Sequence, residues 1–177
     1  MSGLFLCPVP PPSRNAGALN RAPADFLSDN ILNMKNISNS LEDTRNTAFK
    51  FASKLIKEDR ATVVLLQGDL GSGKTTFAQE LGRIVGVNEN MHSPTFVIMK
   101  VYSINFNNYK KLIHIDAYRI EKEEELLHLG WNEFIKEPEN LILIEWPERV
   151  PKIIPNSAKI VKLTFINENS REIEYEN

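Results

Sequence analysis

The chain has 177 residues, a formal net charge of -2 and a single cysteine, Cys7. This length suits one domain with a substantial core, and the charge argues against a protein whose main task is to coat nucleic acid. One cysteine excludes an internal disulfide framework and a zinc site made of cysteines, which fits a reducing cytoplasm. No apolar run approaches the ~20 residues needed to cross a bilayer, so we expect a cytoplasmic protein without membrane contact.

The first 33 residues differ in composition from the rest, since they hold five of the ten prolines and no lysine or glutamate. We predict a disordered Pro-rich leader over residues 1–33 and a single domain over residues 34–177. A start codon placed too early, with Met34 as the functional beginning, explains the leader equally well. An organelle-targeting peptide is the alternative, and Asp25 and Asp29 count against it.

The remainder alternates between helical and strand patterns. Helices are expected over residues 38–59 with Ser38 or Ser40 as N-cap, from Lys74 to about Val85, and over residues 121–129. Strands are expected over residues 62–68, 95–104, 110–118 and 140–146, with a final hairpin that turns between Asn167 and Ser170. This alternation predicts an α/β fold: a three-layer sandwich of the phosphate-loop NTPase type, with a mostly parallel central sheet and a C-terminal hairpin.

The stretch "GDLGSGKTTF" (68–77) satisfies the phosphate-loop pattern Gly-x-x-x-x-Gly-Lys-[Ser/Thr]. It follows an expected strand and opens an expected helix, which a chance glycine-rich turn with a surface lysine does not explain. Lys74 would place its charge at the β/γ-phosphates, and the Thr75 hydroxyl could ligate Mg²⁺. The residues expected to hold the nucleotide are Asp69, Gly71, Ser72, Gly73, Lys74, Thr75 and Thr76.

Acidic residues end two of the expected strands, Asp116 in "LIHID" and Glu145 in "LILIE". Strand ends of a parallel sheet meet at the edge where the phosphate loop lies, so both acids are expected to face Mg²⁺. Strand alternation puts His114 on the same face as Asp116. The competing interpretations are an N-cap or turn residue for Asp116, a solvated strand end for Glu145 and a packing histidine for His114.

The segment "HSPTF" (92–96) lies between the phosphate-loop helix and the next expected strand. Switch segments of phosphate-loop proteins occupy this place. Ser93 and Thr95 could therefore reach a phosphate or the metal ion. An ordinary Ser-Pro turn is the alternative.

Five motifs in this order and spacing, "GDLGSGKTTF", "SPTF", "HIDAYR", "ELLHLG" and "IEWPERV", closely resemble the TsaE family. That family consists of small ATPases needed for threonylcarbamoyladenosine modification of tRNA. The resemblance covers roughly residues 38 to 165. Ala117 departs from it, because many members carry a larger apolar residue there, and the region after Lys162 has no clear match.

The resemblance implies an ATPase that binds ATP with Mg²⁺ and hydrolyses it slowly alone. It implies Lys74, Asp116 and Glu145 as catalytic residues, Thr75, Asp116 and Glu145 at the metal, and Thr44 in contact with the nucleotide. It also implies partners of the TsaD and TsaB type, of which TsaD transfers the threonylcarbamoyl group. Transfer RNA would be reached only indirectly, through that complex.

Other functions remain open at this point. No Asn-Lys-x-Asp string is present, which disfavours a GTPase. A small phosphate-loop kinase that acts on a metabolite or nucleotide shares the loop and is the main alternative. A third possibility is a protein in which ATP binding alone changes the affinity for a partner. It differs from the ATPase only in that Asp116 and Glu145 would not hydrolyse the nucleotide.

Overall fold

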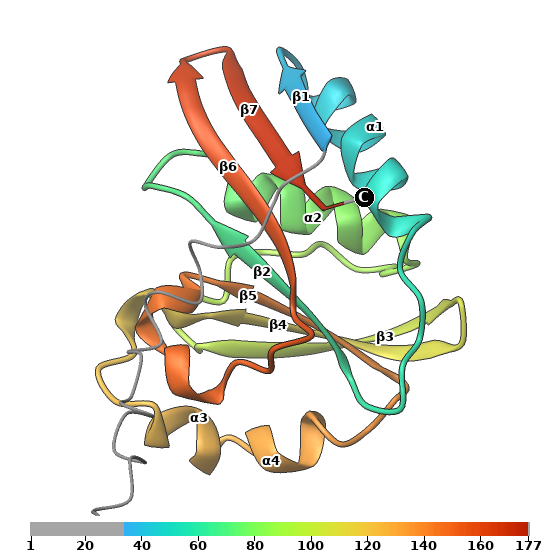
Figure 1. The fold of residues 1–177 in the computed structure, drawn as a ribbon, viewed down its shortest axis with the longest axis vertical. Coiled ribbons are helices and arrows are strands. Elements are labelled where there is room, and N and C mark those ends of the chain that lie inside the picture. Colours follow the sequence, from blue (N-terminus) through green and yellow to red (C-terminus); the bar gives the residue numbers. More distant parts are fainter. Residues whose placement is uncertain (1–33, 177) are drawn as a thin grey trace, which may run out of the picture.

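A seven-stranded sheet runs through the molecule in the order β1-β7-β6-β2-β5-β4-β3 (Figure 1). The computed structural model describes residues 34–176. Its strands are β1 (Met34–Ser38), β2 (Thr62–Gln67), β3 (Met99–Phe106), β4 (Tyr109–Asp116), β5 (Asn140–Glu145), β6 (Lys159–Asn167) and β7 (Ser170–Tyr175). Its helices are α1 (Leu41–Ala52), α2 (Lys74–Ile84), α3 (Glu124–His128) and α4 (Trp131–Phe134), with short 3₁₀ turns η2 (Ala117–Arg119), η3 (Pro147–Arg149) and η4 (Pro151–Ile153).

The four strands β6, β2, β5 and β4 pair in parallel and form the centre of the sheet. Antiparallel pairs extend it on both sides, with β3 beside β4 and then β7 and β1 beyond β6. The α/β fold and the C-terminal hairpin are therefore confirmed. Strand β1 was not predicted, because its short sequence "MKNIS" alternates little and the strand is defined by its pairing with β7.

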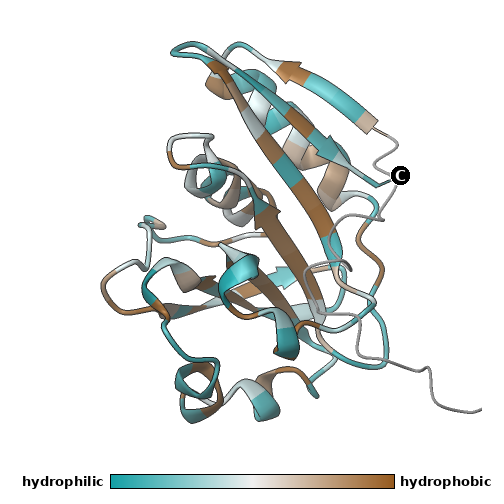
Figure 2. Cartoon of the chain, turned by 60° about the vertical axis from the view of Figure 1, so that its left-hand side comes forward, coloured by the Kyte–Doolittle hydropathy of each residue, from teal (hydrophilic) through white to brown (hydrophobic). Residues whose placement is uncertain are grey.

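Two hydrophobic clusters lie on opposite faces of the sheet. One is covered by α1 and α2, which contribute Phe51, Phe77 and Leu81, and the other packs against Leu126 of α3 and Trp131 of α4. Because β2 and β5 are covered on both faces, nearly all of their residues are buried. Figure 2 shows these central strands as nearly continuous hydrophobic ribbons, whereas the outer strands alternate.

The helix bounds differ from the expected ones for local reasons. Ser40 is the N-cap of α1, as predicted, and its side chain accepts a hydrogen bond from the Asp43 amide. The predicted helix over residues 38–59 is too long, because Ser38 belongs to β1 and α1 ends at Ala52. Gly130, at φ 93°, ends α3 and precedes the short α4, which the sequence did not predict.

The expected strand over residues 95–104 begins late. Residues 95–97 form a turn, and β3 starts at Met99 after Ile98, whose φ is 64°. The segment "HSPTF" is consequently a loop over the edge where β4 ends. The prediction for residues 1–33 lies outside the described part of the chain, and within residues 34–176 no helix is long and apolar enough to cross a membrane.

Candidate functional site

The phosphate loop connects β2 to α2, as predicted. Gly68, Gly71 and Gly73 all have positive φ, at 141°, 80° and 99°. At Gly68 a side chain is also excluded by space, since an added Cβ would lie 2.1 Å from the Leu163 carbonyl oxygen of β6. The loop is thus folded tightly against β6, and its last glycine caps α2 in a left-handed conformation.

Lys74 points back into its own loop. Its Nζ donates to the carbonyl oxygens of Gly68 at 2.6 Å and Asp69 at 2.9 Å. The side chain is buried, and this desolvation lowers the pKa of Lys74, while Glu145 is the strongest of the nearby carboxylates that raise it. The loop therefore holds a desolvated cation at the N-terminus of α2, where phosphate groups bind in other proteins.

Glu145 ends β5 directly beside the phosphate loop. In the parallel register it pairs with Leu66 of β2 and with Asp116 of β4. Its Oε2 accepts a hydrogen bond of 2.9 Å from the Thr75 hydroxyl, and its Oε1 lies 2.8 Å from His114 Nε2. Glu145 is only 2% exposed, so it is not a solvated strand end.

Asp116 ends β4 and is held by the "HSPTF" loop. Its Oδ2 accepts hydrogen bonds from Thr95 Oγ1 at 2.5 Å and from Ser93 Oγ at 3.1 Å. Its Oδ1 accepts from the Tyr118 amide, so the carboxylate also caps η2. Asp116 is therefore an N-cap, and its other oxygen contacts the "HSPTF" loop. The N-cap interpretation and the site interpretation do not exclude each other.

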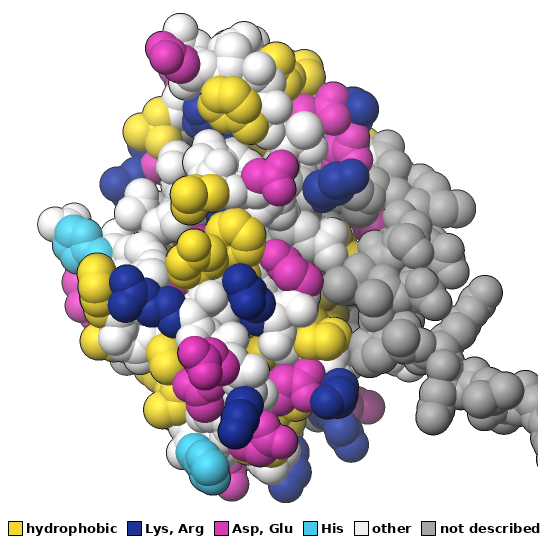
Figure 3. Space-filling model, turned by 90° about the vertical axis from the view of Figure 1, so that its left-hand side faces the viewer, with side chains coloured by type: hydrophobic (Ala, Val, Ile, Leu, Met, Phe, Trp, Pro, Cys, Tyr) yellow, Lys and Arg dark blue, Asp and Glu magenta, His cyan; other side chains and the backbone are white. Residues whose placement is uncertain are grey.

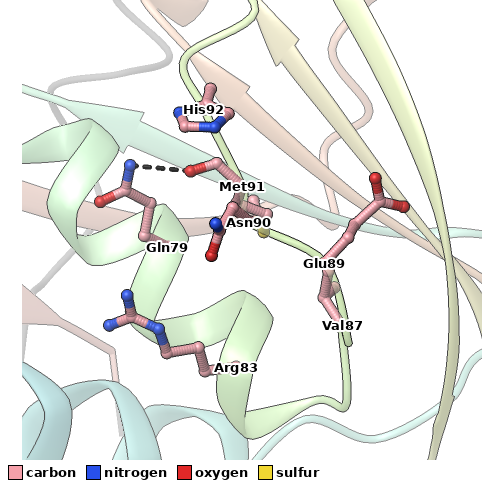
Figure 4. Close-up of a pocket in the computed structure, with 7 residues that line it drawn as sticks. All are labelled: Gln79, Arg83, Val87, Glu89, Asn90, Met91 and His92. Carbon is pink, nitrogen blue, oxygen red and sulfur yellow. Dashed lines mark hydrogen bonds between the residues drawn. The ribbon is translucent and has the colours of Figure 1, made fainter.

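The loop before Ser93 is fixed to α2. The Gln79 side-chain amide donates to the Met91 carbonyl oxygen at 2.9 Å, and the Met91 sulfur fills the space beside Gly82, where a Cβ would lie 2.1 Å from it. A small cavity of about 190 Å³ lies along this contact (Figure 4). The attachment leaves residues 92–98 as the segment that reaches from α2 to Asp116.

These elements enclose a cavity of about 370 Å³ at the ends of the parallel strands. Its lining combines the glycine loop, hydroxyl groups, two carboxylates and two aromatic rings: Leu70, Gly71, Gly73, Lys74, Thr75, Thr76, Ser93, Thr95, Asp116, Tyr118, Glu145 and Trp146. The fold therefore brings together Lys74, Thr75, Asp116 and Glu145, which the sequence singled out from three separate segments.

Three predicted nucleotide residues do not line this cavity. The Thr44 hydroxyl is buried, 2.7 Å from Ser38 Oγ, and it donates to the Ser40 carbonyl oxygen. Asp69 contributes its carbonyl oxygen to Lys74 rather than its side chain. The Ser72 hydroxyl is buried and has no hydrogen-bond partner within residues 34–176. Direct contacts of these side chains with a nucleotide stay predictions.

Trp146 was overlooked as a site residue. Its backbone is left-handed, at φ 60° and ψ 50°, which is rare for a bulky residue and turns the ring over the phosphate loop. The ring centre lies 3.7 Å from Lys74 Nζ and 5.1 Å from the ring centre of Tyr118. The position directly after Glu145 in "IEWPE" was the only sequence signal for it.

Arg171 of β7 was also overlooked. A Cβ added to Gly73 would lie 3.2 Å from Arg171 Cδ, and the buried Arg171 Nε has no hydrogen-bond partner in the described chain. This contact depends on the register of the β6–β7 hairpin, in which Phe165 pairs with Arg171. No local motif marks it, so the sequence alone could not identify it.

Comparisons with known proteins agree with this architecture. The family model "Threonylcarbamoyl adenosine biosynthesis protein TsaE" matches residues 38–173. The tRNA threonylcarbamoyladenosine biosynthesis protein TsaE of Rickettsia typhi is 41% identical over 135 residues, which cover 75% of this chain and 88% of the relative. The protein of the same name from Rickettsia bellii is 37% identical over 143 residues, with 80% and 93% covered.

Among solved structures, the crystal structure of Bacillus subtilis YdiB superimposes with a TM-score of 0.63 at 25% identity. The match covers 83% of this chain and 87% of YdiB. The residues matched by the family model include the phosphate loop, both strand-end acids and most of the C-terminal hairpin. The chain belongs to the TsaE family of threonylcarbamoyl adenosine biosynthesis proteins.

Proposed function

We propose that this protein is a Mg²⁺-dependent ATPase that supports threonylcarbamoyladenosine modification of tRNA by acting on a complex of the TsaD–TsaB type. Membership of the TsaE family supports the pathway. The observation that carries the enzymatic part is the cavity in which Lys74, Thr75, Asp116 and Glu145 converge. A lysine, a hydroxyl and two carboxylates around a glycine loop are the groups that phosphoryl-transfer sites use.

The phosphate loop would hold the triphosphate. Lys74 would exchange the carbonyl oxygens of Gly68 and Asp69 for β/γ-phosphate oxygens and stabilise the charge that develops there. Arg171 approaches Gly73 from β7, on the opposite side of β2 from Glu145. In this proposal Arg171 would meet the part of the nucleotide that points away from the metal.

The residues present fit Mg²⁺. The Thr75 hydroxyl and the carboxylates of Glu145 and Asp116 are hard oxygen ligands, and Thr75 and Glu145 already contact each other. No group of three or more His, Cys, Asp or Glu in the described chain could hold a metal ion by itself, and a Mg²⁺ bound with nucleotide takes its remaining ligands from phosphates and water. When bound, Mg²⁺ would neutralise charge on the phosphates, while the carboxylates orient the attacking water.

The surface around the cavity supports a protein partner. Leu70 of the phosphate loop and Phe96 of the "HSPTF" loop are 80% and 84% exposed. Figure 3 shows hydrophobic side chains interspersed with both basic and acidic side chains on the face that lies to the left in Figure 1. A docking surface beside the cavity would bury these apolar side chains. In this proposal TsaD–TsaB covers that surface, and tRNA is contacted by the partners.

The test measures ATP hydrolysis by the purified protein, alone and with the TsaD–TsaB pair. We expect slow release of inorganic phosphate alone and faster release with the pair. Glu145→Gln should keep ATP binding but lose turnover, whereas Glu139→Gln, an exposed acid at the opposite end of β5, should behave like wild type. Transfer of the phosphoryl group to a metabolite instead of water would favour a small phosphate-loop kinase and refute the proposal.

A further inference from the structure

The two strand-end carboxylates are held by different kinds of donor. Asp116 is bound by the hydroxyls of Ser93 and Thr95, both on the surface loop over the cavity. Glu145 is bound by Thr75 at the cavity and by His114 from inside the sheet. The partners of Asp116 can move with their loop, whereas His114 sits in a central strand between β3 and β5.

His114 is fully buried and does not line the cavity. Glu145 is the only group in residues 34–176 that hydrogen-bonds its ring, because Nδ1 is buried without a partner. A histidine that merely filled space would bury this polar nitrogen at a cost that a leucine avoids. The ring therefore makes one polar contact, and its target is the carboxylate beside the phosphate loop.

The geometry also defines which atom donates. A carboxylate Oε1 at 2.8 Å requires a proton on His114 Nε2. In the neutral tautomer that carries its proton on Nε2, Nδ1 has no proton. No N–H group of the ring is then buried without a partner. With Oε1 fixed by His114, the second oxygen of Glu145 is directed at the Thr75 hydroxyl and the cavity.

We propose that His114 is a positioning residue, which fixes the Glu145 carboxylate so that Oε2 faces the cation of a bound Mg²⁺–nucleotide. The inference rests on the proposed function and deepens it. Residues that hydrogen-bond to a metal ligand set its orientation, and their loss typically lowers metal affinity about 10–100-fold. Glu145 would accordingly be the permanent acidic ligand of the site, because its orientation does not depend on the surface loop.

The test compares two amide substitutions of His114. In His114→Gln the side-chain NH₂ can reach the former Nε2 position, whereas in His114→Asn it is too short. Isothermal titration calorimetry would measure ATP affinity with Mg²⁺ and with EDTA. We expect all proteins to bind ATP equally in EDTA. The strengthening by Mg²⁺ should fall about 10–100-fold in His114→Asn and be largely retained in His114→Gln.

Leu112→Val is the matched control, since Leu112 is buried on the same face of β4 two residues earlier. It loosens the core without touching Glu145, so its Mg²⁺ dependence should match wild type. Equal Mg²⁺ dependence in His114→Asn and wild type, or an equal loss in Leu112→Val, would overturn the inference. A wild-type protein that binds no ATP, or binds it without any effect of Mg²⁺, would refute the proposed function as well.

A measurement on the unmodified protein covers the case in which the variants do not fold. NMR of ¹⁵N-labelled imidazole rings reports which nitrogen carries the proton. We expect the His114 proton on Nε2, with a resonance that shifts when Mg²⁺ and ATP are added. A ring protonated on Nδ1 alone cannot donate to Glu145, and this result would contradict the inference.

Discussion

The ammonium group of Lys74 lies 3.7 Å from the centre of the Trp146 ring. The same group donates hydrogen bonds to two carbonyl oxygens of its own loop. In the nucleotide-free protein the lysine is thus held by contacts that a triphosphate would have to replace.

Nucleotide binding should change the fluorescence of Trp146, because the cation leaves its ring when Lys74 turns to the phosphates. The protein has two tryptophans, and the second, Trp131, is a buried residue of α4 and does not line the cavity. Trp131→Phe should keep the ATP-dependent change in emission, and Trp146→Phe should lose it. A change that persists in Trp146→Phe would show that the Lys74–Trp146 contact is not the reporter.

ATP affinity should fall at alkaline pH. Burial lowers the pKa of Lys74 below its usual 10.5, so the free protein loses this charge earlier than an exposed lysine does. Binding favours the charged form, and affinity is therefore full below the lowered pKa and declines as pH rises through it. Lys74→Arg, which stays charged, should remove the decline, and Lys74→Ala should weaken binding ~10–100-fold at neutral pH. Calorimetry across the pH range checks both.

Gly68→Ala should destabilise the fold by about 2–4 kcal/mol, because its Cβ would overlap the Leu163 carbonyl oxygen at 2.1 Å. Gly71 offers a control, since its φ is also positive but no atom lies within 4 Å of an added Cβ. Gly71→Ala should therefore cost only the backbone strain, about 1 kcal/mol. Chemical denaturation measures both free energies of unfolding, and equal losses would contradict this difference.

Thr95→Val should loosen the "HSPTF" loop. The hydrogen bond by which Asp116 accepts from the Tyr118 amide should remain. The substitution keeps the side-chain shape and removes the hydrogen bonds of the hydroxyl with Asp116 and Ser93, so we expect a loss of about 1–2 kcal/mol in the free energy of unfolding. Amide hydrogen exchange should rise over residues 93–98 and stay unchanged in β5. Unaltered exchange in the loop would mean that the Thr95 hydroxyl does not restrain it.

The features predicted correctly are those that a local pattern determines. The glycine string requires its turn wherever it follows a strand, and two carboxylates at the ends of parallel strands must meet at one edge. Asp116 and Glu145 are in fact register partners on β4 and β5. The β3–β4 turn also follows a local preference, because Asn107 and Asn108 tolerate the positive φ that a tight hairpin needs.

The features missed depend on contacts between distant segments. Strand β1 exists because β7 offers it an open edge, and Arg171 reaches Gly73 only through the register of the C-terminal hairpin. Trp146 adopts a left-handed backbone conformation, which is rare for bulky residues. The backbone preference of tryptophan therefore gave no indication of where its ring lies. Tertiary packing decides each of these cases, and a single sequence carries no pattern for it.

The pairing of Met34 with Tyr175 sets the first and last described strands side by side. The two ends of the described chain are therefore adjacent in space. A circular permutant that links residue 176 to residue 34 through a few glycines, and opens at Asn107–Asn108, would keep every strand neighbour of the sheet. The new ends would leave from the tip of the β3–β4 hairpin, and neither would interrupt the β6–β7 hairpin that carries Arg171 to the phosphate loop.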